Sequence, residues 1–239
     1  ARQWVVNGRE TAWNADAEAW LADALQVLFR RTSFQARERA TRIHAARGVD
    51  GLWAEIPRLH SSSALTTYYE VLLQHARLDG SQARRIAEDA GRRIASSSDL
   101  SSVLRTLLER GPMDDATRLA IMTSAARIGS NSDRAEVLVT ATEQGTLTET
   151  HAHAILQAAA GIGSSSDRAR VLTAVGQRLP ASVPLPDNYI AVAGGVRSSS
   201  NLAEVLVTLL EREEVAGQRL VTVLTIASKI PSNSDLARV

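Results

Sequence analysis

Serine and aspartate recur three residues apart along the C-terminal two thirds of the chain. A serine followed three residues later by an acid is typical of a helix capping box, in which the hydroxyl accepts a backbone N–H and the acid reaches back to the helix start. Each link supplies only one carboxylate, so we interpret the pairs as structural caps and not as repeated cation or phosphate sites. The pairs are Ser96 with Asp99, Ser130 with Asp133, Ser164 with Asp167, and Ser232 with Asp235.

A competing assignment places each cap two residues later. In that case the acid occupies the first helical position, where its charge favours the positive end of the helix. Both assignments leave the serine-rich string structural. The alternative caps are Ser98, Ser132, Ser166 and Ser200.

The other candidates for chemistry lack partners at catalytic or metal-binding spacing. His151 and His153 are two residues apart, about 200° around a helix, so they cannot share a metal and we expect exposed or half-buried rings. Asp114 and Asp115 have no companion that suggests general acid and base roles. The sequence contains no cysteine, phosphate-binding loop, dinucleotide-binding fingerprint or nucleophile elbow. We therefore predict no catalytic residue, no metal site and no cofactor.

The charge balance argues against nucleic acid as a partner. The 239 residues include 27 basic and 26 acidic side chains, whereas a general polyanion binder needs a clear basic excess. No apolar run approaches the roughly 18 residues needed to cross a bilayer, so we predict no direct membrane insertion. The chain begins at Ala1 without a methionine and stops inside a repeat at Val239, and we expect it to be part of a longer polypeptide.

The serine-rich links mark a 34-residue repeat, which is typical of stacked helix pairs. We predict an all-α, right-handed α-solenoid of HEAT-like or tetratricopeptide-like helix pairs, in which residues 59–239 form the array. The copies start at Ile94, Ile128, Ile162, Val196 and Ile230, with a looser copy near Leu59.

Comparison of the copies with one another separates a predicted core from a predicted surface. Columns that hold valine, leucine or alanine in every copy are expected to be buried, as at Val171, Leu172 and Ala159. Two columns of the second helix vary in character, and we predict that both face outwards. These are Thr117, His151, Leu185 and Arg219, and Thr123, Gln157, Ala191 and Thr225.

The first 58 residues do not follow the repeat. Residues 1–13 contain a strand-like stretch that ends at the turn signal Asn7-Gly8, and we interpret them as an arm or as the end of a preceding domain. Residues 14–58 are predicted to form a helical cap rich in aromatic residues, with an aromatic ligand cage as the alternative. The first cap helix carries an apolar stripe that we expect to be core: Trp20, Leu21, Ala24, Leu25, Leu28 and Phe29.

One copy departs from the pattern because prolines replace its usual loop and the first turn of its second helix. An irregular loop on a regular scaffold is a candidate contact point, and a harmless insertion-tolerant loop is the alternative. The candidate partner contacts are Pro184, Leu185 and Pro186.

The repeated string I-x-S-x-S-D-x-A-x-V-L resembles the I-S-S-D-Y-D-K-A-R-V-L repeats of bacterial HEAT-like α-solenoid proteins, with Ser132 and Arg134 in place of the tyrosine and lysine. The tryptophan, leucine-glycine and tyrosine of tetratricopeptide repeats are missing. The opening is similar to the repeat tails of BlaR-like membrane metallopeptidases and of uncharacterised envelope proteins. The segments that carry this similarity are 6–10, 20–22, 31–32 and 48–56.

The resemblance implies a bacterial protein whose peptidase activity, if any, belongs to a different domain, because no H-E-x-x-H motif occurs here. We expect a non-catalytic protein-binding or scaffolding module, as a stabilising subunit or tail of a larger assembly that can include membrane proteins. The alternative is a regulatory or sensor tail of a membrane-anchored metallopeptidase that binds a peptide or small ligand. The expected partner is a protein and not nucleic acid, and the expected location is peripheral to the membrane, on the periplasmic rather than the cytoplasmic side.

Overall fold

The computed structural model describes residues 3–111, 113–212 and 216–239, and these residues fold as an α-solenoid-like helical protein. They form thirteen α-helices, one short 3₁₀ helix and two short strands, so the all-α prediction is confirmed for the body of the chain. The chain divides into two compact units, Ala1–Ala76 and Arg77–Val239. The predicted boundaries near residues 13 and 58 stay predictions.

The N-terminal arm is a β-hairpin. Strand β1 (Trp4–Val6) pairs antiparallel with β2 (Arg9–Thr11), and Trp4 lies opposite Thr11. Asn7 and Gly8 both have positive φ, 50° and 79°, as the tight two-residue turn between twisted strands requires. The sequence indicated only the first strand, and its partner follows directly after the turn. Residues 1 and 2 of the predicted arm lie outside the described residues.

Three helices complete the N-terminal unit: α1 (Ala15–Arg31), α2 (Ala36–Glu55) and α3 (Ser62–His75). The side chain of Asn14 caps α1 by accepting the N–H of Ala17 at 3.0 Å. Helix α2 is kinked at Gly48, whose positive φ interrupts the helix, and a 3₁₀ turn over Ile56–Arg58 follows it. Helices α2 and α3 pack on each other, and their contact forms the core of this unit.

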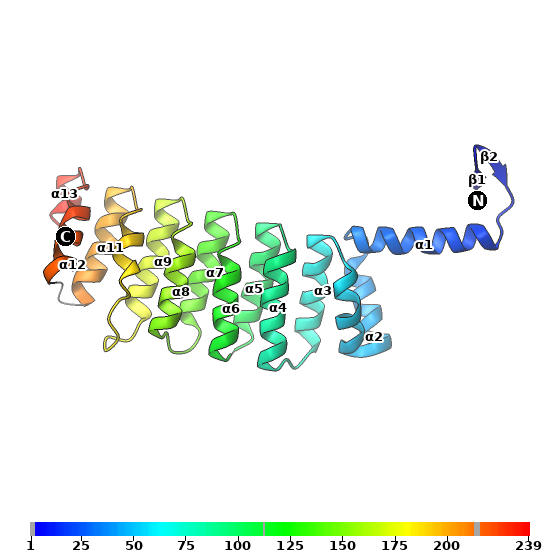
Figure 1. The fold of residues 1–239 in the computed structure, drawn as a ribbon, viewed down its shortest axis with the longest axis horizontal. Helices are drawn as coiled ribbons and strands as arrows, with labels where there is room; N and C mark the ends of the chain where they lie inside the picture. The colour runs from blue at the N-terminus through cyan, green and yellow to red at the C-terminus, as the bar shows by residue number, and fades with distance from the viewer. Residues whose placement is uncertain (1–2, 112, 213–215) are drawn as a thin grey trace. The chain divides into compact units, whose positions relative to one another are not determined.

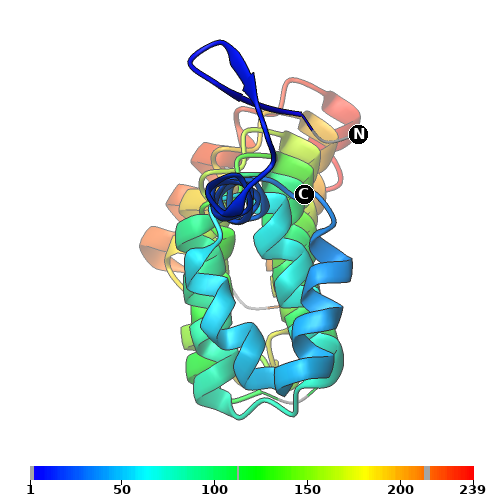
Figure 2. The same ribbon diagram turned by 90° about the vertical axis from the view of Figure 1, so that its right-hand side faces the viewer.

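The C-terminal unit consists of two layers of helices, which Figure 1 shows from the side and Figure 2 shows end on. One layer contains α4 (Gly80–Arg93), α6 (Asp115–Ala125), α8 (Glu149–Ala159), α10 (Asn188–Ala193) and α12 (Gly217–Ala227). The other contains α5 (Ser97–Glu109), α7 (Asn131–Glu143), α9 (Ser165–Arg178), α11 (Ser199–Arg212) and α13 (Asn233–Leu236). Helices that are two apart along the chain, such as α4 and α6 or α7 and α9, are therefore neighbours within one layer.

The core of the C-terminal unit lies between the two layers. The predicted buried columns are confirmed, since the described valines, leucines and alanines at these positions are buried in each complete copy. Val171, Leu172 and Ala159 have no exposed surface. Val239, the last member of the valine column, is half-buried.

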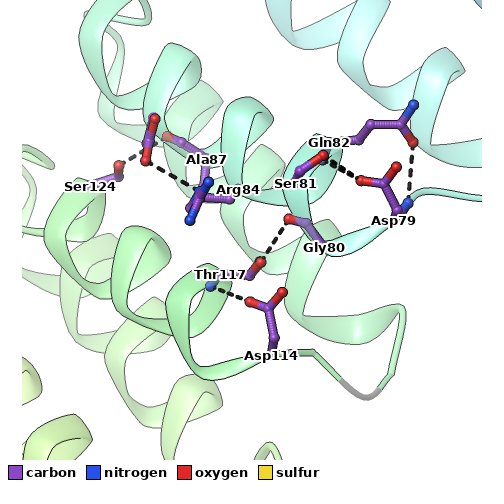
Figure 3. Close-up of polar contacts among 10 residues, drawn as sticks. Asp79, Gly80, Ser81, Gln82, Arg84, Ala87, Asp114, Thr117 and Ser124 are labelled. Atoms are coloured by element: carbon purple, nitrogen blue, oxygen red, sulfur yellow. Dashed lines mark hydrogen bonds and ion pairs between the residues drawn. The ribbon is translucent and has the colours of Figure 1, made fainter.

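Helices α4 and α6 approach each other closely through small side chains (Figure 3). The buried hydroxyl of Ser124 donates to the carbonyl of Ala87 at 2.9 Å. A Cβ added at Gly91 would lie 2.5 Å from the Oγ atom of Ser124, closer than real Cβ atoms come to a neighbour. Glycine is required at this position because any side chain would push the two helices apart.

Candidate functional site

The four serines predicted to cap helices lie at the N-caps of α5, α7, α9 and α13. In each case the serine hydroxyl accepts the backbone N–H of the acid three residues later, at 3.3–3.4 Å. The competing assignment is wrong, because the later serines lie inside their helices. The caps are Ser96, Ser130, Ser164 and Ser232; the later serines are Ser98, Ser132, Ser166 and Ser200.

The complete reciprocal capping box forms at α4. The Asp79 carboxylate accepts the N–H of Gln82 at 2.8 Å, and the Gln82 side chain accepts the N–H of Asp79 at 3.1 Å (Figure 3). The sequence pattern S-x-x-[DE] did not reveal this box. Here the cap residue is an aspartate and the residue three positions later is a glutamine.

The residue after three of the cap serines connects one link to the next, a role that was not predicted from the sequence. Its side chain accepts backbone N–H groups 32 or 33 residues further along the chain. A short polar residue recurs at this position in each copy, and that column was the available signal. The bonds run from Gly129 and Ser130 to Ser97 at 3.0 and 3.1 Å, from Gly163 to Asn131 at 2.8 Å, and from Arg197 to Ser165 at 3.0 Å.

The column predicted to face outwards at Thr117, His151 and Leu185 is buried, so that prediction is wrong. These residues lie between consecutive helices of one layer. The hydroxyl of Thr117 donates to the Gly80 carbonyl at 3.0 Å (Figure 3), and Arg219, the half-buried fourth member, donates to the Leu185 carbonyl at 3.2 Å. The other outward column is exposed as predicted, at Thr123, Gln157, Ala191 and Thr225.

His151 is buried between two helices, contrary to the prediction of an exposed or half-buried ring, whereas His153 is exposed. The Nδ1 atom of His151 lies 2.9 Å from the Thr148 hydroxyl, and the Nε2 atom of His151 lies 3.4 Å from a carboxylate oxygen of Asp115. Burial lowers the pKa of His151 below its ordinary value, as does the nearby Arg118 guanidinium, while Asp115 opposes the shift. The ring is therefore a neutral, structural contact at neutral pH.

Of the three predicted contact residues in the proline-rich loop, Leu185 and Pro186 are buried and so are not available to a partner. Pro184 is exposed, and its contact with a partner stays a prediction. Helix α10 is short, as the prolines led us to expect. The Arg212 guanidinium holds the loop by donating to four carbonyls. These belong to Gly176 at 2.9 Å, Leu179 at 2.6 Å, Pro180 at 2.6 Å and Val183 at 2.7 Å.

The apolar stripe of α1 is largely exposed, so the prediction that it forms core is also wrong. Of its members, Trp20, Leu25 and Leu28 are 58%, 36% and 42% exposed, and the others are half-buried. Val27, which the stripe did not include, is 53% exposed, and Ala17 is the buried residue of this helix. Within the N-terminal unit, α1 projects away from α2 and α3 (Figure 1). The hairpin covers only its beginning, where the rings of Trp4 and Trp20 lie 5.3 Å apart. The described residues of this unit therefore leave the stripe open.

A cavity of about 390 Å³ lies between the end of α1, one face of α2, and α3. We call it the arginine cavity. Helix α2 supplies residues spaced i, i+3, i+4, i+7 and i+8, which share one helix face. These are Arg39, Arg42, Ile43, Ala46 and Arg47; the other lining residues are Gln26, Phe29, Arg30, Glu55 and Tyr68. The regular spacing on α2 was visible in the sequence, but nothing there showed that α1 and α3 close the space around it.

Arg39 is the most buried charge of the arginine cavity, with 7% of its surface exposed. Its Nε atom donates to the Gln35 carbonyl at 3.3 Å, and its Nη1 atom donates to the Phe29 carbonyl. The guanidinium lies over the Phe29 ring, 4.8 Å from its centroid. The Nη2 atom is buried and has no hydrogen-bond partner among the described residues. Arg39 therefore joins α1 to α2 and keeps donor capacity unused.

Glu55 is the acid of the arginine cavity, and it is already engaged. Its two carboxylate oxygens lie 3.2 Å from Arg30 and 3.5 Å from Arg58. Burial raises the pKa of Tyr68 at the base of the cavity, and Arg39 opposes that shift. The cavity therefore keeps a net positive charge beside aromatic and aliphatic walls.

Over the described ranges, no group of three or more histidine, aspartate and glutamate side chains is arranged to hold a metal ion. None of the helices in these ranges is both long and apolar enough to span a bilayer. No protein-family model, curated protein or solved structure matches the chain. Its function therefore has to be inferred from the exposed α1 stripe and the arginine cavity.

Proposed function

We propose that the chain is a non-catalytic protein-binding or scaffolding module that inserts α1 into an apolar groove of a protein partner. The exposed stripe of α1 carries this proposal. Its exposed large side chains Trp20, Val27 and Leu28 are spaced i, i+7 and i+8, a spacing by which an amphipathic helix anchors in a groove. Large apolar side chains gathered on one exposed helix face are a common mark of an interaction site.

The rest of the chain suits a support for such a contact. The Ser97, Asn131 and Ser165 bonds join successive copies, and the buried columns join the two layers, so together they give a regular body. As part of the same proposal, we infer that the layers form a right-handed array of 34-residue HEAT-like repeats. Repeat arrays of this kind use extended surfaces to hold other proteins.

Charge substitutions on the stripe test the proposal. Leu28→Glu and Trp20→Glu place a carboxylate on the stripe, and Ala22→Glu places the same charge on the opposite face of α1 as a matched control. All three positions are exposed, so each variant should unfold at the same urea concentration as the parent. We expect the stripe variants to lose a partner that co-purifies from the native source, and the control to keep it. Recovery of the parent chain only as a free monomer would refute the proposal.

A second candidate function is favoured by the arginine cavity, which offers a site for a ligand. Under this hypothesis the chain is the regulatory or sensor tail of a membrane-anchored metallopeptidase and binds a peptide or small ligand on the periplasmic side. The resemblance of the opening segments to such tails supports it. The full gene provides the test, because this function requires a membrane-spanning peptidase domain upstream of residue 1.

A further inference from the structure

We propose that the arginine cavity binds a carboxylate attached to an apolar group, as at the C-terminus of an extended peptide that ends in an apolar residue. The inference rests on the second candidate function, because both require a ligand in this cavity. It does not depend on partner binding by α1, so its failure would leave the scaffolding proposal standing.

The charge of the arginine cavity calls for an anion. Arg30 and Arg58 neutralise Glu55. The positive charges of Arg39, Arg42 and Arg47 in the cavity lining therefore have no acidic partner in the cavity. Arg42 uses its Nε atom on the Glu38 carbonyl at 3.3 Å. Its terminal nitrogens, and the whole guanidinium of Arg47, have no hydrogen bond or ion pair with other residues in the described part of the chain. Two exposed arginines are therefore available to a ligand at the cavity.

The buried Arg39 guanidinium adds a fixed donor. Its Nε and Nη1 atoms are held by backbone carbonyls at Gln35 and Phe29, so the plane of the group is set in advance. A buried donor without an acceptor costs free energy, and a ligand oxygen that reached Nη2 after a small side-chain movement would recover it. A guanidinium with a fixed orientation loses little entropy on binding an acceptor.

The walls select a carboxylate with an apolar body over a multiply charged anion. Phe29, Ile43 and Tyr68 provide aromatic and aliphatic surface beside the arginines. Glu55 is paired with Arg30 and Arg58, so charge alone does not select among anions, and the apolar walls favour a carboxylate with an apolar body. The volume of about 390 Å³ lies at the small end of the range for ligand pockets, enough for a terminal residue and part of the next. Planar guanidinium groups also match the two oxygens of a carboxylate.

Titration calorimetry on the full chain tests the proposal with four probes. The first is a hexapeptide with a C-terminal leucine and a free carboxylate, and the second is the same peptide with a C-terminal amide. The third is N-acetyl-leucine, and the fourth is inorganic phosphate. We expect the free-acid peptide to bind at least tenfold more tightly than the amide, because the amide cannot pair with the arginines. Equal binding of the first two probes, or no binding of the first at millimolar concentration, would overturn the proposal.

The other two probes identify the source of the carboxylate. Binding of N-acetyl-leucine as tight as that of the peptide would assign the site to small apolar acids, and binding at least tenfold weaker would assign it to peptide termini. Both outcomes support the shared chemistry. Phosphate that displaced the peptide at equal concentration would contradict it.

Substitutions locate the site. Arg39 is unsuitable because it holds α1 to α2, so we use the double variant Arg42→Gln/Arg47→Gln, whose side chains are exposed. The control is Arg31→Gln in the last turn of α1, which is exposed and does not line the cavity. We expect the double variant to bind the free-acid peptide at least tenfold more weakly than the parent while its urea midpoint stays unchanged. The control variant Arg31→Gln should bind the peptide with the affinity of the parent. Unaltered binding in the double variant would place the peptide elsewhere and refute the assignment.

Discussion

Replacement of Leu172 by alanine measures how much the core between the layers contributes to stability. Leu172 lies in α9, which packs against α7 and α11, and it has no exposed surface. The change removes three carbon atoms, which at about 0.8 kcal/mol for each buried methylene is a loss of roughly 2.4 kcal/mol before any cavity is counted. A cavity that does not collapse raises the total towards about 5 kcal/mol. We therefore expect Leu172→Ala to lower the free energy of unfolding by about 2 to 5 kcal/mol.

Urea denaturation followed by circular dichroism gives the free energy, and hydrogen exchange shows where the chain opens. Since each helix pair contacts mainly its neighbours, exchange should increase most in α7, α9 and α11. Gln157→Ala is the control, because Gln157 is exposed on α8, and it should change stability by less than about 0.5 kcal/mol. Equal effects of Leu172→Ala and Gln157→Ala would show that the assignment of buried and outward columns is wrong.

Three further changes test separate features of the fold. Gly91→Ala should destabilise by about 1 to 3 kcal/mol in urea melts, because the new methyl group meets α6, whereas an exposed helical glycine would gain stability from alanine. Ser164→Ala should cost about 1 kcal/mol and Ser166→Ala much less in the same assay, because only the first hydroxyl caps α9; equal losses would contradict this. The lowered pKa of His151 means that the unfolded chain binds a proton that the folded chain does not. Stability should therefore fall as the pH drops below about 6.5, by at most about 1.4 kcal/mol per pH unit from this residue. Urea midpoints against pH should show a smaller fall in His151→Gln and an unchanged one in His153→Gln, and identical profiles for the two variants would refute the reasoning.

The repeat allowed the body of the fold to be predicted from the sequence. Val171, Leu172 and Ala159 are each one member of a column, and a residue type that recurs in every copy has the same surroundings in every copy. The same logic correctly identified Ser130 and its equivalents as structural. It could not choose between Ser130 and Ser132 as the cap, because both fit the local spacing and only the backbone conformation separates them.

The errors arose where side chains meet across copies or outside the repeat. In the column of Thr117 and His151, these two residues make different polar contacts with the preceding helix of their layer, and the variation in residue type was taken as a sign of exposure. The stripe around Trp20 was assigned to the core because helical periodicity shows that a face is apolar but not that another element covers it. The arginine cavity needs three helices at once, and no pattern along one helix predicts how they meet.

Site-specific photo-crosslinking at Val27 tests most directly whether α1 docks onto a protein. A photoreactive amino acid replaces Val27 in the chain expressed in its native source, and the same residue at Ala22 on the opposite face of α1 and at Gln157 on α8 provides two exposed controls. The proposed function predicts a discrete adduct with a protein partner from position 27, and none of comparable yield from positions 22 and 157. Equal yields at all three positions, or no adduct at position 27 with the chain recovered as a monomer, would contradict it.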